Sequence, residues 1–189
     1  MNTYQDLENS LFEIVTSQFP DWEVIMAFDN GPEPTGPYIV VDVQRLSPIG
    51  REYNSTPTFG IDGQQLTVTT IQDHEAKVRF EFIGKYDDNT TLAEMVSNLQ
   101  VALRTERGYQ LQQEHRLSLF GMTNVRRIPI KRETSNFMIY QLDCNFGYAI
   151  VMTTDVDTAA GVIIDGVYHD AGREPDHVIH SHIEINTNP

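Results

Sequence analysis

The sequence predicts an α+β protein built on a mainly antiparallel or mixed sheet of about five to six strands, with two helices packed on one face and an extended C-terminal hairpin or tail. Helical periodicity occurs in two segments. Strand-like segments follow one another in adjacent pairs without a helix between them, which favours antiparallel pairing. Hydrophobic residues make up 40% and aromatic residues 10% of the 189 residues, enough for a core.

The first predicted helix spans residues 3–18. Its apolar side chains recur with helical spacing, at Leu7, Leu11, Ile14 and Val15. Thr3 followed by Asp6 resembles a capping box, and Pro20 ends the segment. We therefore expect an amphipathic helix that packs one face against the sheet.

Two strands should follow, at residues 22–28 and 38–44. The segment between them holds three prolines and two glycines, which excludes regular structure there. The second of these strands begins apolar on both faces, which indicates an interior position in the sheet. Residues 45–65 show neither helical nor strand periodicity, so they are predicted to form a long loop or projecting arm.

Residues 66–71 and 75–84 are predicted to be consecutive strands joined by a short turn at 72–74. In the second strand, one face is apolar, made by Ala76, Val78, Phe80 and Phe82. The opposite face carries Lys77, Arg79 and Glu81. This alternation is typical of a half-buried strand with one face in water.

The second predicted helix begins at Asn89 or Thr90 and ends at Gly108. Arg104 and Arg107 suit the negative end of its dipole, and a further short turn can follow at 110–115. The helix has one apolar stripe, formed by Leu92, Met95, Val96, Leu99, Ala102 and Leu103.

The last part of the core is predicted to contain a strand at 118–133, kinked at Pro129, and a long strand at 137–150. We therefore expect a core domain at 1–153, with the arm at 45–65, and a C-terminal extension at 154–189. In this extension an Asp-Gly turn predicts a small hairpin at 162–172, and 177–185 is a last extended segment.

Charge is unevenly distributed along the chain. Eight carboxylates and no cation precede Arg45, residues 45–133 hold 12 of the 13 basic side chains against 11 acidic ones, and the rest has only Arg173 against eight acids. The three parts carry −8, +1 and −7, which gives the net charge of −14. This balance argues against a broad grip on nucleic acid, but it suits a surface that nucleic acid passes without binding.

The sequence shows no pattern typical of a signal peptide, a membrane span or an intrachain disulfide. The N-terminus lacks a basic region followed by an apolar core, so no signal peptide is expected, and no run of 18 apolar residues predicts a membrane span or a membrane partner. Cys144 is the one cysteine, which rules out an intrachain disulfide. Its place on the apolar side of a strand predicts a buried packing thiol.

The sequence nominates no catalytic residues and no cofactor. Nucleophile elbows, phosphate-binding loops, dinucleotide fingerprints and the H-E-x-x-H motif are all absent, so we expect no enzyme. One alternative is a small metal-dependent enzyme that uses C-terminal histidines, at His169, His177, His180 and His182. On a strand His180 and His182 share a face while His177 points away, so a solvated or interface tail is the better interpretation.

A basic cluster is the main candidate for an interaction surface. Arg126, Arg127, Lys131 and Arg132 lie within seven residues in a chain that is otherwise acidic. A solvated strand face is the simplest explanation, but we favour contact with an acidic block of another copy. The expected subunit or partner interface adds the basic and aromatic residues near the arm, Arg45, Arg51 and Tyr53.

Three stretches together are similar to the neck and tail-terminator proteins of tailed bacteriophages. The first contains Asn30-Gly31-Pro32 and Pro37-Tyr38 before an apolar strand, and the second is the turn Pro48-Ile49-Gly50. The third is a basic strand that ends in Phe82-Ile83-Gly84 before an amphipathic helix. The resemblance covers roughly residues 20–150.

This resemblance implies a structural virion protein at the neck or head-proximal end of the tail, present in the host cytoplasm during assembly. It implies a homo-oligomer, in the family's usual form a hexameric ring, that terminates the tail tube and joins it to the head connector. The expected partners are the tail tube protein, a head-completion or connector protein, a sheath protein if the tail contracts, and genomic DNA that passes without specific binding. The alternative within the same class is another tail component, of the tube or baseplate.

Overall fold

The computed structural model describes residues 4–54, 58–59, 65–132, 135–157, 161–169 and 178–186. Contacts divide the chain into two compact units, Met1–Tyr53 with Thr70–Met152, and Asn54–Thr69 with Thr153–Pro189. The hydrophobic core described below belongs to the first unit.

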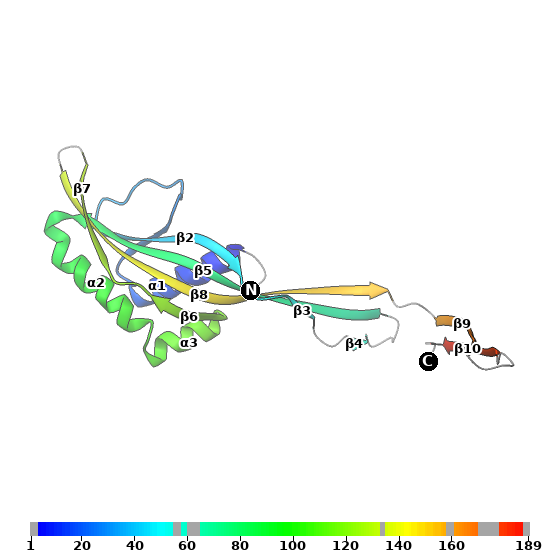
Figure 1. Cartoon of the computed structure of the whole chain (residues 1–189). Helices are drawn as coiled ribbons and strands as arrows, with labels where there is room; N and C mark the ends of the chain where they lie inside the picture. The colour runs from blue at the N-terminus through cyan, green and yellow to red at the C-terminus, as the bar shows by residue number, and fades with distance from the viewer. Residues whose placement is uncertain are drawn as a thin grey trace. The chain divides into compact units, whose positions relative to one another are not determined.

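The first unit contains the α-helices and the larger part of one sheet, drawn as a ribbon in Figure 1. The helical elements are α1 (Tyr4–Gln18), η1 (Tyr86–Asp88), α2 (Asn89–Ala102) and α3 (Glu106–Glu114). The strands of this sheet are β1 (Glu23–Met26), β2 (Tyr38–Pro48), β5 (Gln65–Lys85), β6 (Leu117–Met122), β7 (Arg126–Arg132) and β8 (Ser135–Asp157), with the two-residue strands β3 (Tyr53–Asn54) and β4 (Thr58–Phe59) on β5.

The sheet has the order β1-β2-β5-β8-β6, and β7 also pairs with β8. β1 and β2 are parallel, whereas β2 with β5, β6 with β8, and β7 with β8 are antiparallel. The side-chain contacts Arg79–Asp143 and Glu81–Gln141 show β5 and β8 antiparallel as well, because residue numbers rise on one strand as they fall on the other. The predicted α+β class and mixed sheet are confirmed.

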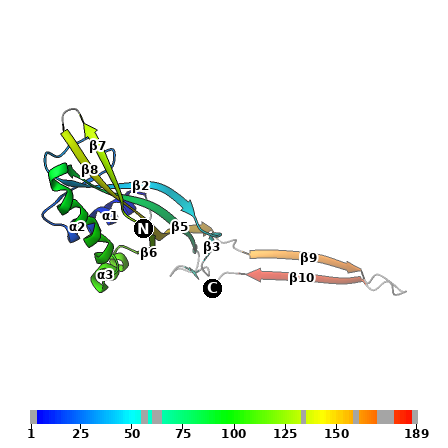
Figure 2. The same ribbon diagram turned by 60° about the vertical axis from the view of Figure 1, so that its left-hand side comes forward.

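The core lies between the helices and one face of the sheet, and Figures 1 and 2 show the helices against the strands. The predicted apolar stripes of α1 and α2 are buried there, together with Val78, Phe80 and Phe82 of β5. Phe19 and Phe80 extend this packing through edge-to-face contacts with Phe82 and Phe146. Thr3, expected to cap α1, lies outside the described residues.

β5 is one continuous strand, so the turn predicted at 72–74 is wrong. Pro48 of β2 pairs with His74, and the amide of Ile49 donates to the carbonyl of Asp73 at 2.8 Å. Polar side chains made this segment resemble a turn, but backbone pairing with β2 keeps it extended. β2 correspondingly runs to Pro48, beyond the predicted end at residue 44, and the bulge between Val43 and Arg45 shifts its register.

The strand predicted at 118–133 is divided in two, and its break is not at Pro129. β6 pairs with β8 from Leu117 to Met122, and β7 resumes pairing at Arg126. Pro129 lies inside β7 opposite Met138, where an edge strand tolerates the missing amide proton. Thr123 occupies the break and donates its amide to the carbonyl of Asp143 at 2.9 Å.

Helix α3 is longer than the predicted short turn, and α2 ends before Arg104. Gly108 therefore stops no helix, because it lies buried in the first turn of α3. A Cβ atom at this position would lie 2.1 Å from the carbonyl oxygen of Ala102. Close packing of the two helices explains the glycine, and Thr105 caps α3 by accepting from the Gly108 amide at 3.2 Å.

In the second unit, β9 (Gly161–His169) pairs antiparallel with β10 (Val178–Asn186), as the two arrows in Figure 2 show. The last extended segment predicted at 177–185 is confirmed in this strand. The Asp-Gly turn at Asp165-Gly166 is wrong, because β9 continues through these residues and pairs them with His182 and Ser181. Residues 170–177, which hold the rest of the predicted hairpin, lie outside the described residues.

Candidate functional site

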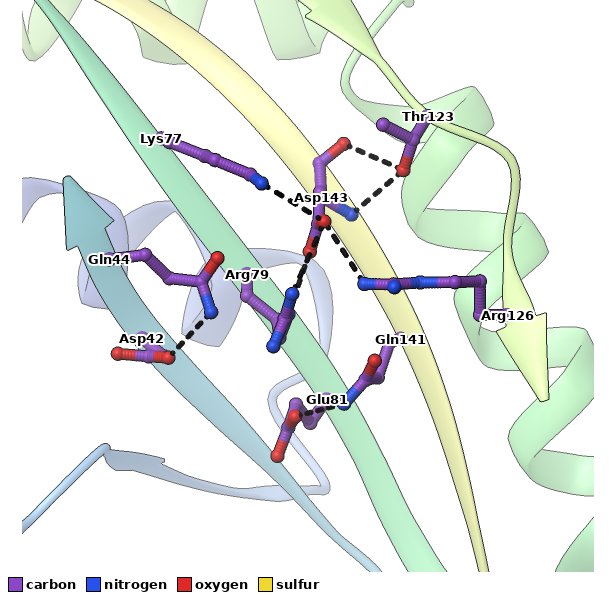
Figure 3. Close-up of polar contacts among 9 residues, drawn as sticks. All are labelled: Asp42, Gln44, Lys77, Arg79, Glu81, Thr123, Arg126, Gln141 and Asp143. Carbon is purple, nitrogen blue, oxygen red and sulfur yellow. Dashed lines mark hydrogen bonds and ion pairs between the residues drawn. The ribbon is translucent and has the colours of Figure 1, made fainter. Parts of the chain in front are cut away.

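The face of the sheet that points away from the helices carries a charged cluster around Asp143. We call it the Asp143 cluster and define it by Lys77, Arg79, Arg126 and Asp143. On β5 the buried residues Val78 and Phe80 face the helices, so the alternating Lys77 and Arg79 face the other way. Figure 3 shows three basic side chains from β5 and β7 converging on one carboxylate of β8.

The geometry of the cluster is that of one anion shared by three cations. Arg79 Nε lies 2.8 Å from Asp143 Oδ1, Arg126 Nη2 lies 3.1 Å from Oδ2, and Lys77 Nζ lies 3.6 Å from Oδ2. The Asp143 residue is 6% exposed, whereas the three basic side chains remain partly in solvent. The Asp143 carboxylate oxygens are therefore occupied by contacts within the protein, whereas the three basic side chains still have N–H donors in solvent for further partners.

The hydrogen bond from Arg79 is the main reason why the pKa of Asp143 is lower than usual, and the charges of Arg79, Lys77 and Arg126 add to this effect. The same bond raises the pKa of Arg79. Two further side-chain hydrogen bonds continue the polar contacts along the sheet. The Gln141 amide donates to the Glu81 carboxylate, and the Gln44 amide donates to the Asp42 carboxylate. The Asp143 carboxylate is therefore ionised at neutral pH.

An apolar patch lies on the same face, next to the cluster. Tyr38, Ile83 and Ile139 are its buried members. Partly buried side chains pack around them, namely Ile25, Val40, Ile128, Ile130 and Phe137. The sequence predicted a solvated face for the 75–84 strand and for the basic cluster. The register of β1, β2, β5, β7 and β8 instead brings apolar residues from five strands together on this face.

Glu33 ties the loop after β1 to this patch. Its carboxylate accepts a hydrogen bond from the Tyr38 hydroxyl at 2.7 Å and forms an ion pair with Arg132. Burial and this bond raise the pKa of Tyr38 to about 12, and the bond is the main cause of the lowered pKa of Glu33. The Arg132 guanidinium also lies 5.3 Å from the ring centre of Phe137.

The basic cluster predicted from sequence is gathered on β7, but its members have different environments. Arg126 and Arg132 are paired with Asp143 and Glu33. Arg127 and Lys131 are exposed, and within the described residues neither has an ion-pair partner. These two side chains are therefore available to another molecule.

The other expected interface residues lie apart from β7. Arg45 is on β2, where Nε donates to Ser47 Oγ at 2.8 Å, and together with Lys77 it lines a depression of about 180 Å³. Arg51 is exposed after β2. Tyr53 is in β3, for which the structure defines the backbone alone. Their assignment to an interface stays a prediction.

Sequence reasoning missed the pairing of Asp143 with Lys77 and Arg79. The alternation along each strand placed these residues on polar positions, but the sequence holds no sign of which strands are neighbours. The one available signal is that two half-buried strands carry opposite charges, basic on one and acidic on the other. This signal predicts a particular ion pair only once β8 is known to lie beside β5.

The described residues hold no group of three or more histidine, cysteine, aspartate and glutamate side chains placed to bind a metal. His169 and His182 lie in β9 and β10, for which the structure gives the backbone register, so the histidine alternative stays a prediction.

Cys144 is the predicted buried thiol, 1% exposed, and burial raises its pKa to about 12. No helix of the described ranges has the length and apolarity to cross a membrane.

A family profile described as phage neck terminator protein matches residues 5–171. The chain belongs to the phage neck terminator family. Membership implies a structural protein of the virion neck that associates with neck and tail components, and a non-enzymatic role. The resemblance that the sequence motifs indicated is thereby confirmed.

Comparison with curated protein sequences finds no match for this neck terminator. Among solved structures, one similar chain has a TM-score of 0.35 and 14% sequence identity. The alignment covers 78% of the neck terminator and 92% of the other chain.

Proposed function

We propose that this neck terminator forms a ring, hexameric in its assembled state, that ends the tail tube and joins it to the head connector. Genomic DNA would pass through the lumen. The direct partners would be the tail tube protein and a head-completion or connector protein, with a sheath protein if the tail contracts. Family membership over residues 5–171 supports the place in the virion.

The main observation in support of a ring is that the two edges of the sheet differ in charge. At the β1 edge, Asp21, Glu23 and Asp29 are exposed in a segment without any cation. At the opposite edge, β7 exposes Arg127 and Lys131 without ion-pair partners among the described residues. Opposite edges of complementary charge favour a head-to-tail contact between copies, which closes into a ring when the rotation allows.

The net charge of −14 agrees with passage of DNA rather than grip. A protein that binds duplex DNA needs cations on phosphates, and an acidic lumen repels the phosphate backbone. The cations of the sheet face are instead shared with Asp143 or left for protein partners. This supports contacts between proteins as the use of the basic side chains.

The test is assembly of the purified protein alone and on purified tail tubes. We expect native mass spectrometry to find a closed multiple of the 21.5 kDa chain, and electron microscopy to find rings or tubes capped at one end. Tubes capped with this protein should then join filled heads, whereas bare tubes should not. A chain that stays monomeric at high concentration and leaves tube ends bare would refute the proposal.

A further inference from the structure

One aromatic side chain stands out on the surface of the first unit. Phe28, directly after β1, is 96% exposed. Its φ of 65° lies in the left-handed region, which a bulky residue seldom adopts. Hydrogen bonds on both sides fix this conformation, from the Ala27 amide to Val41 at 2.8 Å and from the Asp29 amide to Met26 at 3.2 Å. The fold therefore keeps the Phe28 ring in solvent on a backbone conformation that costs energy, and burial of the ring does not offset this cost.

A pocket of about 360 Å³ is lined by residues of β5, β6 and β8, together with Ile49 and Arg116. Aromatic groups line it, since the His74 ring stacks on Tyr148 with centres 5.4 Å apart and Phe120 is 60% exposed. Gly147 lies beneath Phe120, because a Cβ atom there would come within 2.2 Å of that ring. The pocket therefore has a volume that suits an aromatic side chain and a lining in which aromatic groups stand beside polar ones.

One cation stands at the rim of this pocket. Arg116 lines it, is exposed, and has a φ of 55°, again in the left-handed region. Among the described residues its side chain has no ion-pair partner. The Asp73 carboxylate also lines the pocket, so its lining holds one acid and one cation beside the aromatic side chains. An aromatic residue followed by an acidic one fits this pocket when the acidic side chain lies against Arg116 and away from Asp73.

Phe28 and Asp29 are an aromatic residue followed by an acidic one. They lie at the opposite edge of the sheet from the pocket. Phe28 follows β1, the strand at one edge, while Arg116 and Phe120 belong to the β6 edge. The intervening strands β2, β5 and β8 separate the two features within a chain. A second copy of the chain can bring them together, and the contact would be head-to-tail.

We propose that Phe28 of one copy occupies the pocket of the next copy, with the Asp29 carboxylate against the Arg116 guanidinium. This contact rests on the proposed ring and names its subunit joint. Burial of Phe28 among His74, Tyr148 and Phe120 supplies the apolar contact, and the pair at the rim sets the orientation. The strained backbone at Phe28 is then explained, because it presents the ring to the neighbour.

The first test replaces Phe28→Asn. Asparagine is well suited to positive φ, so the variant should keep or raise the thermal midpoint of the monomer. Self-association, measured by sedimentation or as capping of tail tubes, should weaken roughly thirty-fold, as for loss of a central aromatic anchor. The matched control is Val101→Asn on α2, 66% exposed, which should assemble like the wild type.

The second test exchanges charges, with Asp29→Arg, Arg116→Asp and the double variant. Aspartate tolerates the positive φ of residue 116. Each single variant should weaken assembly about tenfold, and the double variant should regain it, which a general loss of stability would not produce.

The outcomes separate this joint from the ring itself. Wild-type rings with unaffected assembly of Phe28→Asn would overturn the joint and leave the proposed ring intact. Failure of the double charge variant to recover beyond either single variant would overturn the Asp29–Arg116 pairing. A wild type that neither self-associates nor caps tubes would overturn both proposals.

Discussion

At the scale of single residues, Asp143 is the side chain on which the polar sheet face depends most. Replacing Asp143→Asn keeps the shape but leaves Lys77, Arg79 and Arg126 facing one another without a counter-charge. Because these cations are partly exposed, we expect a loss of about 2 kcal/mol in the free energy of unfolding. Urea denaturation at neutral pH measures it. As a control, Glu114→Gln, which breaks an exposed pair with Arg107, should cost less than about 0.5 kcal/mol.

The pH dependence of this loss identifies its cause. The pKa of Asp143 is lowered in the folded protein, so the charge stabilises the fold above the unfolded value, about 3.9 for aspartate. The stabilisation disappears as pH falls through the lower, folded pKa. The difference between wild type and Asp143→Asn should thus be constant from about pH 7 to 5 and shrink below about pH 4. A difference that persists unchanged in acid would mean that charge is not its source.

Residue-level prediction from sequence succeeded where a pattern is local. The alternation that put Val78 and Phe80 inside and Lys77 and Arg79 outside is confirmed, because strand periodicity alone decides it. The environment of Asp143 could not be predicted in this way. Its partners come from strands that are 64 and 17 residues away along the chain.

At the scale of elements, the sequence predicted long amphipathic segments well and their connections less well. α1 and α2 were evident because many apolar side chains repeat with one period. Segment 72–74 and Gly108 were misinterpreted, since polar residues and glycine usually mark turns and helix ends. In this fold, pairing with β2 and close contact with Ala102 determine those positions instead.

Gly108 offers a test of that account of the α2–α3 junction. In Gly108→Ala the new Cβ atom would lie 2.1 Å from the Ala102 carbonyl oxygen, a backbone atom that cannot move alone. We expect a loss of about 2–3 kcal/mol in the free energy of unfolding, by overpacking. The control is Gly121→Ala in β6, where nothing lies within 4 Å of the added Cβ. If Gly108→Ala were as stable as this control, close packing would not explain the glycine.

At the scale of the whole molecule, strand order converts a charge pattern along the chain into a pattern in space. The acidic first 42 residues include β1 at one edge of the sheet, and the basic middle includes β7 near the other edge. The sequence showed that the charges are segregated. It could not show that they end on opposite edges, because pairing of strands distant in the chain decides this. Opposite charge on opposite edges is the physical basis for a head-to-tail contact between copies.

This arrangement predicts how assembly depends on salt. In the double variant Arg127→Glu with Lys131→Glu, the two exposed cations of β7 become acidic and should repel the β1 edge of the neighbour. Self-association of the wild type should weaken about tenfold between low and high salt, because exposed charges are screened beyond about 3 Å at 1 M ionic strength. The double variant should associate poorly at low salt and gain association as salt rises, since screening then relieves repulsion. Sedimentation over a salt series measures both trends.

The control for that series has the same change in net charge at another place. Arg104→Glu with Arg107→Glu alters two exposed cations at the α2–α3 junction, outside β1 and β7. If the contact is local, this control should follow the wild type at every salt concentration. If it instead behaves like the β7 variant, overall repulsion between acidic molecules governs assembly, and the edge-to-edge contact is wrong. Because both variants carry the same total charge, the comparison isolates where the cations lie.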